Sequence, residues 1–378
     1  MVASALFSPF ELRGVRLENR ITVSPMCQYS AVDGCATDWH LMHLGKFAVS
    51  GAGLVMIEAT HVEARGRITP ACLGLYSDDN EAALSRVIGF CRQAGQAKVG
   101  VQLSHSGRKG SAKLPWQGRG MPLSAQEGAW SCVSPGHVPF DDGWPAPQAL
   151  DRQGLDEVKR VHVEAARRCV RIGVDLIELH VAHGYLLHEF LSPLSNTRAD
   201  EYGGSLENRL RYPLEVFSAV RAACPDRMPV GVRVSATDYV EGGWTIEETE
   251  VFARALKRAG CDYMTVSSGG LSPRQEVPIG EGFQLPFARR VRAAAKIPTI
   301  AVGMIYRPQH AESIIRDGDA DLIALARAML FDPHWVWFAA GTLGGKPWYP
   351  PQYIRGFRSE WLRDNRCGQA SQESRTAK

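Results

Sequence analysis

The sequence lacks the features that mark membrane and secreted proteins. Its 378 residues contain no apolar run long enough to cross a bilayer, since charges interrupt even the segment 321–330. Residues 1–7 have neither a basic region nor a long apolar run, so we expect no signal peptide. The nine cysteines are odd in number and no two have motif spacing. This usage favours reduced thiols and a cytoplasmic location.

A strong charge of either sign is absent too. The 43 Lys and Arg residues and 40 Asp and Glu residues leave a formal net charge of +3. That value is too small to indicate a nucleic-acid or membrane partner. A Gly-x-Gly-x-x-Gly motif after the first predicted strand is also missing, so a Rossmann nucleotide site has no support. The apolar content of 45% is typical of a soluble globular enzyme.

What is present is a strand-then-helix pattern that repeats eight times. The predicted strands are 21–27, 53–58, 98–103, 176–180, 230–234, 262–266, 298–302 and 320–325. The predicted helices are 40–49, 80–94, 155–172, 206–222, 245–259, 286–295, 308–316 and one that ends at 338. Eight such units predict an α/β fold of the (β/α)8 TIM barrel type. A doubly wound open sheet is the alternative, because spacing does not show closure.

Three segments stand outside this repeat. Residues 11–17 predict a short hairpin with its turn at Gly14. The connection 110–150 after the third strand is long and contains three tryptophans, which favours a lid over a disordered insertion. Two adjacent prolines, Pro350 and Pro351, predict an extended C-terminal arm. We expect one domain over 1–366, and a frayed polar tail over 367–378.

The most informative stretch is Asp175–Tyr185. It begins as an apolar strand and ends in His180, His183 and Tyr185, so two imidazoles and a phenol meet at the carboxyl end of a strand. Ligands bind at that end in α/β proteins. A metal site is one alternative, although zinc needs three or four ligands and no Cys-x-x-Cys or His-Glu-x-x-His is present. The other alternative is a pair of satisfied core histidines.

A second His-x-x-His pair, His40 and His43, is predicted at the start of a helix. No other chemical group surrounds it in the sequence, so we interpret it as structural.

Other strand ends predict a pocket for a phosphorylated ring. Gly303 and Arg327 follow the seventh and eighth strands, where barrels commonly bind phosphate. Gln102 and Arg233 suit the polar edge of a heteroaromatic ring. FMN fits both ends. The alternative for Arg233 is an internal ion pair with Glu58.

At this point the motifs resemble those of the old yellow enzyme family of FMN-dependent ene-reductases, and within it the thermophilic-like, xenobiotic-reductase class. The resemblance covers nearly the whole chain. Its motifs are Asn19–Ile21, Pro25–Tyr29, Glu58–Thr60, Gly66–Ile68, Gln102–Lys109, Glu178–Tyr185, Ser195–Arg198, Asp200–Arg209, Arg233 and Gln352–Phe357. One departure is Ala326 before Arg327, where the family usually has glycine.

The resemblance implies a set of site residues. Non-covalent FMN would be bound by Ser24, Pro25, Met26, Cys27, Ala59, Gln102, Arg233, Val302, Gly303, Ala326 and Arg327. His180 and His183 would hold the carbonyl oxygen of an α,β-unsaturated substrate, and two fixed donors stabilise the negative charge that develops there. Tyr185 would deliver a proton to Cα. Cys27 would tune the flavin, and Tyr29 would contact the substrate.

The resemblance also implies partners. NADPH would be the reductant, using the same pocket before an enone-type substrate in a ping-pong reaction. Arg355 would reach into a neighbouring subunit's pocket, which implies a homodimer or a dimer of dimers. The alternative is that Arg355 packs on its own barrel.

Two other functions stay open. One is reduction of nitro compounds or nitrate esters, which needs the same hydride donor but not Tyr185. The other is a non-catalytic flavin-binding or metal-binding barrel.

Overall fold

Eight parallel strands close into a barrel in the computed structural model, which describes residues 3–118 and 120–357. They are β3 (Ile21–Val23), β4 (Leu54–His61), β5 (Lys98–Ser104), β8 (Leu176–Val181), β9 (Val230–Ser235), β10 (Met264–Ser267), β11 (Thr299–Ala301) and β12 (Leu322–Leu325). Each strand pairs with its neighbour in the chain, and β12 pairs with β3. The predicted (β/α)8 barrel is confirmed, and the open sheet is wrong.

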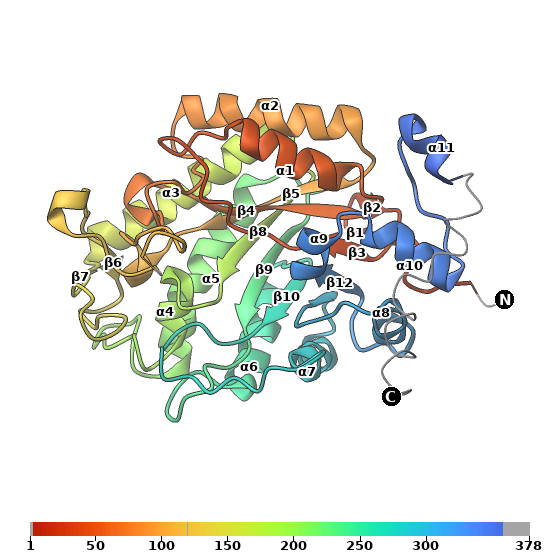
Figure 1. The fold of residues 1–378 in the computed structure, drawn as a ribbon. Coiled ribbons are helices and arrows are strands. Elements are labelled where there is room, and N and C mark those ends of the chain that lie inside the picture. Colours follow the sequence, from red (N-terminus) through yellow and green to blue (C-terminus); the bar gives the residue numbers. More distant parts are fainter. Residues whose placement is uncertain (1–2, 119, 358–378) are drawn as a thin grey trace, which may run out of the picture.

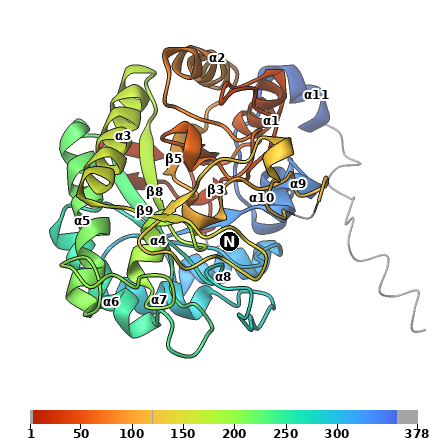
Figure 2. The same ribbon diagram turned by 90° about the vertical axis from the view of Figure 1, so that its left-hand side faces the viewer.

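The helices form a ring around the strands, which Figure 2 shows end-on. They are α1 (Asp38–Ala48), α2 (Asp78–Ala94), α3 (Arg152–Arg171), α5 (Leu206–Ala223), α6 (Ile246–Arg258), α7 (Leu285–Ala295), α8 (Pro308–Arg316) and α10 (Trp335–Leu343). Local sequence sets their starts. Ser77 and Asp151 each accept a backbone N–H at the first turn of α2 and α3, and α6 begins with a capping box of Thr245 and Glu248.

Prolines explain two differences from the predicted elements. The first barrel strand ends at Val23 rather than residue 27, because Pro25 has no N–H to give to a strand ladder. The last predicted helix is two helices, α9 (Arg327–Phe331) and α10. Asp332 between them is extended, as the residue before Pro333 is expected to be.

The predicted hairpin is confirmed as β1 (Phe10–Leu12) and β2 (Val15–Leu17). Leu12 and Leu17 are buried in one apolar cluster with barrel side chains that include Leu54, Leu176 and Leu322. These barrel residues lie where their strands begin, so the hairpin closes the amino end of the barrel. The carboxyl ends of the strands, at the opposite side of the molecule in Figure 1, are left for a site.

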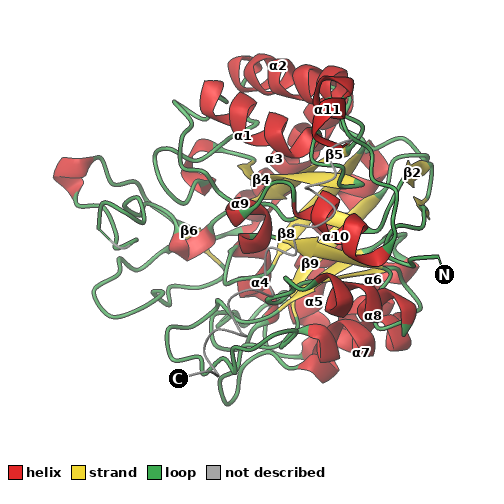
Figure 3. Ribbon diagram, turned by 45° about the vertical axis from the view of Figure 1, so that its right-hand side comes forward, coloured by secondary structure: helices red, strands yellow, loops and turns green. Residues whose placement is uncertain are grey.

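The long insertion lies at that opposite side (Figures 1 and 3). It contains the paired segments β6 (Val133–Ser134) and β7 (Gln148–Ala149). Two further short helices lie next to the strand ends: α4 (Leu186–Leu191) follows β8, and α9 follows β12. In the described part of the chain, no helix is both long and apolar enough to cross a membrane.

The prediction of an extended C-terminal arm is wrong. Residues Pro351–Tyr353 form a 3₁₀ turn that continues into α11 (Ile354–Phe357). Proline is tolerated in the first turn of a helix because that N–H has no partner there, so two prolines do not exclude a helical arm. Figure 1 shows α11 standing apart from the barrel. The predicted tail 367–378 lies outside the described residues, so the domain limits 1–366 stay a prediction.

Candidate active site

The end of β8 brings together the three residues singled out in the sequence. His180 Nε2 and His183 Nδ1 lie 3.3 Å apart, and the ring centroids of His180 and Tyr185 are separated by 4.9 Å. His183 and Gly184 both have positive φ, of 60° and 73°, which turns the chain sharply before Tyr185 begins α4. A Cβ on Gly184 would lie 2.4 Å from the carbonyl oxygen of Gly270, so only glycine fits this turn.

Buried polar groups hold this turn. The Lys109 ammonium donates to the carbonyl oxygens of His183, at 2.9 Å, and Gly270, at 2.8 Å. The Gly184 N–H donates to His188 Nδ1 at 2.9 Å, and His188 Nε2 lies 3.1 Å from Asp238 Oδ1. These hydrogen bonds fix the backbone of the turn and therefore the positions of the His183 and Tyr185 side chains.

The protonation states suit hydrogen-bond donors and a proton source. Burial and then the nearby Arg233 charge lower the pKa of both His180 and His183 well below the usual value. Both imidazoles are therefore neutral and carry one N–H each. Burial raises the pKa of Tyr185 well above its usual value, and likewise that of the Cys27 thiol. Tyr185 keeps its proton, and Cys27 is a thiol.

Neither His-x-x-His pair has the surroundings of a metal site. Among residues 3–118 and 120–357, no group of three or more His, Cys, Asp or Glu side chains is arranged to hold a metal ion. His40 Nδ1 accepts the N–H of Thr37 and so caps α1, and its Nε2 lies 3.3 Å from Glu58. The structural interpretation of His40 and His43 agrees with this capping role.

Next to the histidines, Arg233 provides a buried donor. It pairs with His180 in register across β8 and β9. Its Nε is buried and has no hydrogen-bond partner among the described residues. Burial lowers the pKa of Arg233 and the Glu178 carboxylate opposes this shift. The expected alternative partner, Glu58, instead accepts the N–H of Gln28 at 3.0 Å.

An unpaired buried donor costs free energy unless a ligand accepts from it, which fits the electron-rich edge of a flavin ring. Gln102 lies beside this position and donates to Glu178 at 2.7 Å.

The residues of the predicted phosphate end follow adjacent barrel strands. Gly303 follows β11 with φ of 109°, and a Cβ there would lie 3.0 Å from Gln284 side-chain atoms. Arg327 begins α9 directly after β12, the strand that pairs with β11. The Ser24 N–H donates to the carbonyl oxygen of Leu325, which brings the segment 24–27 beside Ala326 and Arg327. A glycine and an arginine at adjacent strand ends suit a phosphate group.

The insertion reaches the site as the lid interpretation requires. Trp144 packs with Cys27, Tyr29 and Tyr185 around one small apolar cluster. The Arg108 guanidinium donates to the carbonyl oxygens of Val138, at 3.3 Å, and Pro139, at 3.1 Å, and to that of Leu271, at 3.0 Å. Aromatic and apolar side chains that lie over the polar groups at the strand ends would limit the access of water to them.

Some residues at the site were not singled out from the sequence. They are Lys109, Arg108, Glu178, Trp144 and Ser267. Glu178 could have been predicted to lie at the site, because it precedes His180 by two positions and alternate residues of a strand face the same side. Arg108 and Lys109 lie in the motif Gln102–Lys109, but the sequence does not show their roles, since their partners are carbonyl oxygens distant in the chain. Arg355 lies on α11, the last helix of the described chain.

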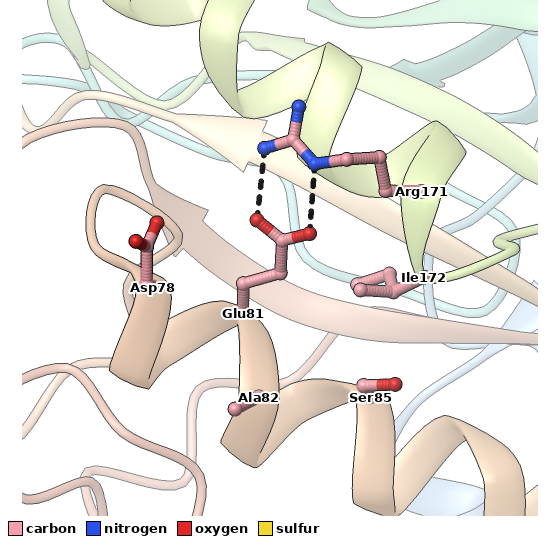
Figure 4. Close-up of a pocket in the computed structure, with 6 residues that line it drawn as sticks. All are labelled: Asp78, Glu81, Ala82, Ser85, Arg171 and Ile172. Atoms are coloured by element: carbon pink, nitrogen blue, oxygen red, sulfur yellow. Dashed lines mark hydrogen bonds and ion pairs between the residues drawn. The ribbon is translucent and has the colours of Figure 1, made fainter.

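A surface pocket elsewhere has a structural explanation. It is lined by Asp78, Glu81, Ala82, Ser85, Arg171 and Ile172, between α2 and the end of α3 (Figure 4). Glu81 accepts two hydrogen bonds from Arg171, at 2.9 and 2.8 Å. These contacts join two helices on the outside of the barrel, away from the strand ends.

Comparison with known proteins shows the family to which the chain is similar. The model of the NADH:flavin oxidoreductase / NADH oxidase family (Oxidored_FMN) matches residues 5–342. An NADPH dehydrogenase of Listeria innocua is 42% identical over 94% of this chain and 100% of its own. An NADPH dehydrogenase of Geobacillus thermodenitrificans is 40% identical over 94% and 99%. Morphinone reductase superposes with a TM-score of 0.74 at 26% identity, over 91% of each chain. One of its structures is a complex with tetrahydroNAD.

Proposed function

The chain belongs to the NADH:flavin oxidoreductase / NADH oxidase family, as an old yellow enzyme-type protein, and on that basis we propose that it reduces the C=C bond of α,β-unsaturated carbonyl compounds. It is an oxidoreductase that uses FMN, with NADPH as reductant. The observation that carries the proposal is the pair of neutral histidine donors, 3.3 Å apart, beside a partly buried tyrosine that keeps its proton.

The residues that would hold FMN fit its two ends. Arg233, through its unpaired buried Nε, and Gln102 would bind the ring edge. Gly303, Ala326 and Arg327 would bind the phosphate, with the remaining contacts from Ser24, Pro25, Met26, Cys27, Ala59 and Val302. When bound, FMN supplies a route for hydride from NADPH to the substrate.

His180 and His183 bind the carbonyl oxygen in this proposal. Hydride addition at Cβ moves negative charge onto that oxygen, so donors placed beforehand stabilise the transition state more than the ground state. Their neutrality matters as well. Two imidazolium ions at this separation would repel each other. Burial, and then the Arg233 charge, lowers both pKa values and prevents this.

Tyr185 completes the reaction by giving its proton to Cα. The ring lies against His180, at the mouth of the strands, and burial keeps the phenol protonated at neutral pH. Tyr29 and the lid residue Trp144 border the same space. A nitro or nitrate-ester substrate would not need the Tyr185 proton, so the environment of Tyr185 favours the ene-reductase over that alternative.

The test is product formation. Purified protein is incubated with NADPH and 2-cyclohexenone under argon, and the product is identified by gas chromatography. Cyclohexanone in amounts equal to the NADPH consumed supports the proposal. Consumption of NADPH with nitrobenzene but not with the enone would favour the nitro alternative. No consumption with either would favour a non-catalytic barrel.

A second subunit completes the site in this proposal. Residues 351–356 of the arm are all exposed, and Tyr353 packs near Trp337 of α10, with ring centroids 6.0 Å apart. Phe331, on α9 beside the strand ends, is 93% exposed, and Phe338 and Tyr306 are exposed nearby in the chain. Exposed aromatic side chains beside an arginine-bearing arm have the composition of an interface between subunits. Arg355 would then enter the pocket of the partner subunit.

Mixing two inactive variants tests the shared arm. In a mixed dimer of Arg355→Ala and Tyr185→Phe chains, a shared arm places both lesions in one site and leaves the other intact. Activity should therefore rise above the sum of the parents after subunit exchange, which mass spectrometry of differently tagged chains verifies. No rise after verified exchange assigns the arm to its own barrel.

A further inference from the structure

The two histidines present two hydrogens to one oxygen only in one combination of tautomers. Each neutral imidazole has one N–H, and the nitrogens that face each other are His180 Nε2 and His183 Nδ1. Both of these atoms must carry the hydrogen if a carbonyl oxygen is to accept from both. Neutrality alone does not secure this, because each ring could equally protonate its other nitrogen.

His180 is fixed by its own turn. The backbone N–H of Ala182 donates to His180 Nδ1 at 3.3 Å. A nitrogen that accepts a hydrogen bond is unprotonated, so the proton of neutral His180 lies on Nε2. His180 therefore presents the required donor.

His183 is governed by Ser267, the last residue of β10. His183 Nε2 lies 2.8 Å from Ser267 Oγ. Ser267 Oγ also accepts an N–H of the Gln284 side chain at 3.3 Å. The Ser267 side chain is buried, and within the described residues His183 Nε2 is the one acceptor in reach of its hydroxyl hydrogen.

The alternative tautomer leaves a buried group unsatisfied. If His183 were protonated on Nε2, Ser267 would accept two N–H groups and its own hydrogen would have no acceptor. A buried donor left in that state costs free energy. If Ser267 donates to Nε2 instead, its hydrogen has an acceptor and its oxygen still accepts from Gln284, so the His183 proton lies on Nδ1.

We propose that Ser267, supported by Gln284, is a positioning residue that fixes His183 in its Nδ1–H tautomer, so that His183 and His180 donate to the same substrate oxygen. This rests on the proposed role of the two histidines as carbonyl donors. The two N–H groups then point toward each other, and an oxygen that accepts from both satisfies them. The arrangement therefore favours an anionic or partly anionic oxygen over a neutral apolar group.

The test reads the tautomer directly. Holoenzyme labelled with ¹⁵N at histidine is studied by NMR, free and with 4-chlorophenol, and a His183→Gln spectrum identifies the His183 signals. With the phenol bound, His183 should be protonated at Nδ1 and unprotonated at Nε2. Protonation at Nε2, or at both nitrogens, overturns the proposal. Because this readout needs no turnover, it is independent of whether the protein reduces enones.

Variants of Ser267 provide a second test. In Ser267→Ala the His183 signals should move toward a mixture of tautomers, and 4-chlorophenol should bind about tenfold more weakly, less than the loss of a whole oxyanion donor. Ser267→Thr keeps the hydroxyl and should retain both properties. The control is Ser268→Ala, whose hydroxyl contacts Gln284 and Tyr239 but neither histidine. If Ser267→Ala leaves both the His183 tautomer and the affinity for 4-chlorophenol unchanged, Ser267 does not fix the tautomer. If Ser267→Ala does not fold, the His183 signals of the wild type and of Ser267→Thr decide the question.

Discussion

Removing both imidazoles by His180→Ala and His183→Ala is the perturbation with the clearest expected size. Loss of one such donor costs about 2.7–4 kcal/mol, or about 10²–10³ in rate. The two nitrogens lie 3.3 Å apart and would share one oxygen, so their losses are not additive. We expect the double variant to lose about 10³–10⁴ in kcat/KM for 2-cyclohexenone, and each single variant about 10²–10³.

The assay follows NADPH oxidation under argon with 2-cyclohexenone as acceptor. The same enzyme is then assayed in air without the enone, because oxygen needs no oxyanion site and its reduction should persist in the double variant. His310→Ala, a partly exposed histidine paired with Glu281 on the outside of the barrel, controls for loss of an imidazole as such. A double variant that reduces the enone at the parent rate refutes the assignment. Equal losses with enone and oxygen would indicate damage to FMN binding instead.

The remaining predictions concern the neighbours of this pair. Tyr185→Phe should slow enone reduction by about 10²–10⁴, the usual contribution of a general acid, and slow nitroalkene reduction less, which parallel assays check. Arg233→Leu should weaken FMN retention on a desalting column, since the ring edge loses its buried donor; retention equal to wild type would contradict this. A chain that ends after Tyr349 should keep FMN but elute at a smaller size and bind enones more weakly; an unchanged elution volume would contradict the shared arm. The lowered pKa values of His180 and His183 mean that the unfolded chain binds more protons below about pH 6.5, so stability is present above that pH and lost below it. Chemical denaturation from pH 5 to 7 should show a slope that approaches about 1.4 kcal/mol per pH unit for each of the two histidines below about pH 6 and flattens above about pH 6.5; this contribution should be absent when both are replaced by Asn.

Much of the barrel could be predicted because its signals are local. Ser77, Asp151 and Thr245 mark helix starts through contacts within four residues, and the apolar run of β8 marks a buried strand. His180, His183 and Tyr185 were found for the same reason, since one strand and one turn carry all three. Closure of the sheet was predicted from the number of strand-then-helix units, and the pairing of β12 with β3 shows it.

What could not be predicted depends on contacts between distant segments. The proline pair in the arm was interpreted from its local preference, but proline is compatible with both an extended chain and a first helical turn. Ser267 is the last residue of β10 and belongs to no distinguishing motif. Its importance comes from His183, which is 84 positions away in the chain. Lys109 likewise acts through two carbonyl oxygens whose positions only the fold determines.

The central claim is that this barrel passes reducing equivalents from NADPH to an activated alkene. The most direct measurement is an anaerobic titration of the purified yellow protein followed by its visible absorbance. One equivalent of NADPH should bleach the yellow colour, and one equivalent of 2-cyclohexenone should then restore it. A protein that NADPH bleaches and the enone leaves colourless contradicts the claim, as does one whose absorbance NADPH does not change.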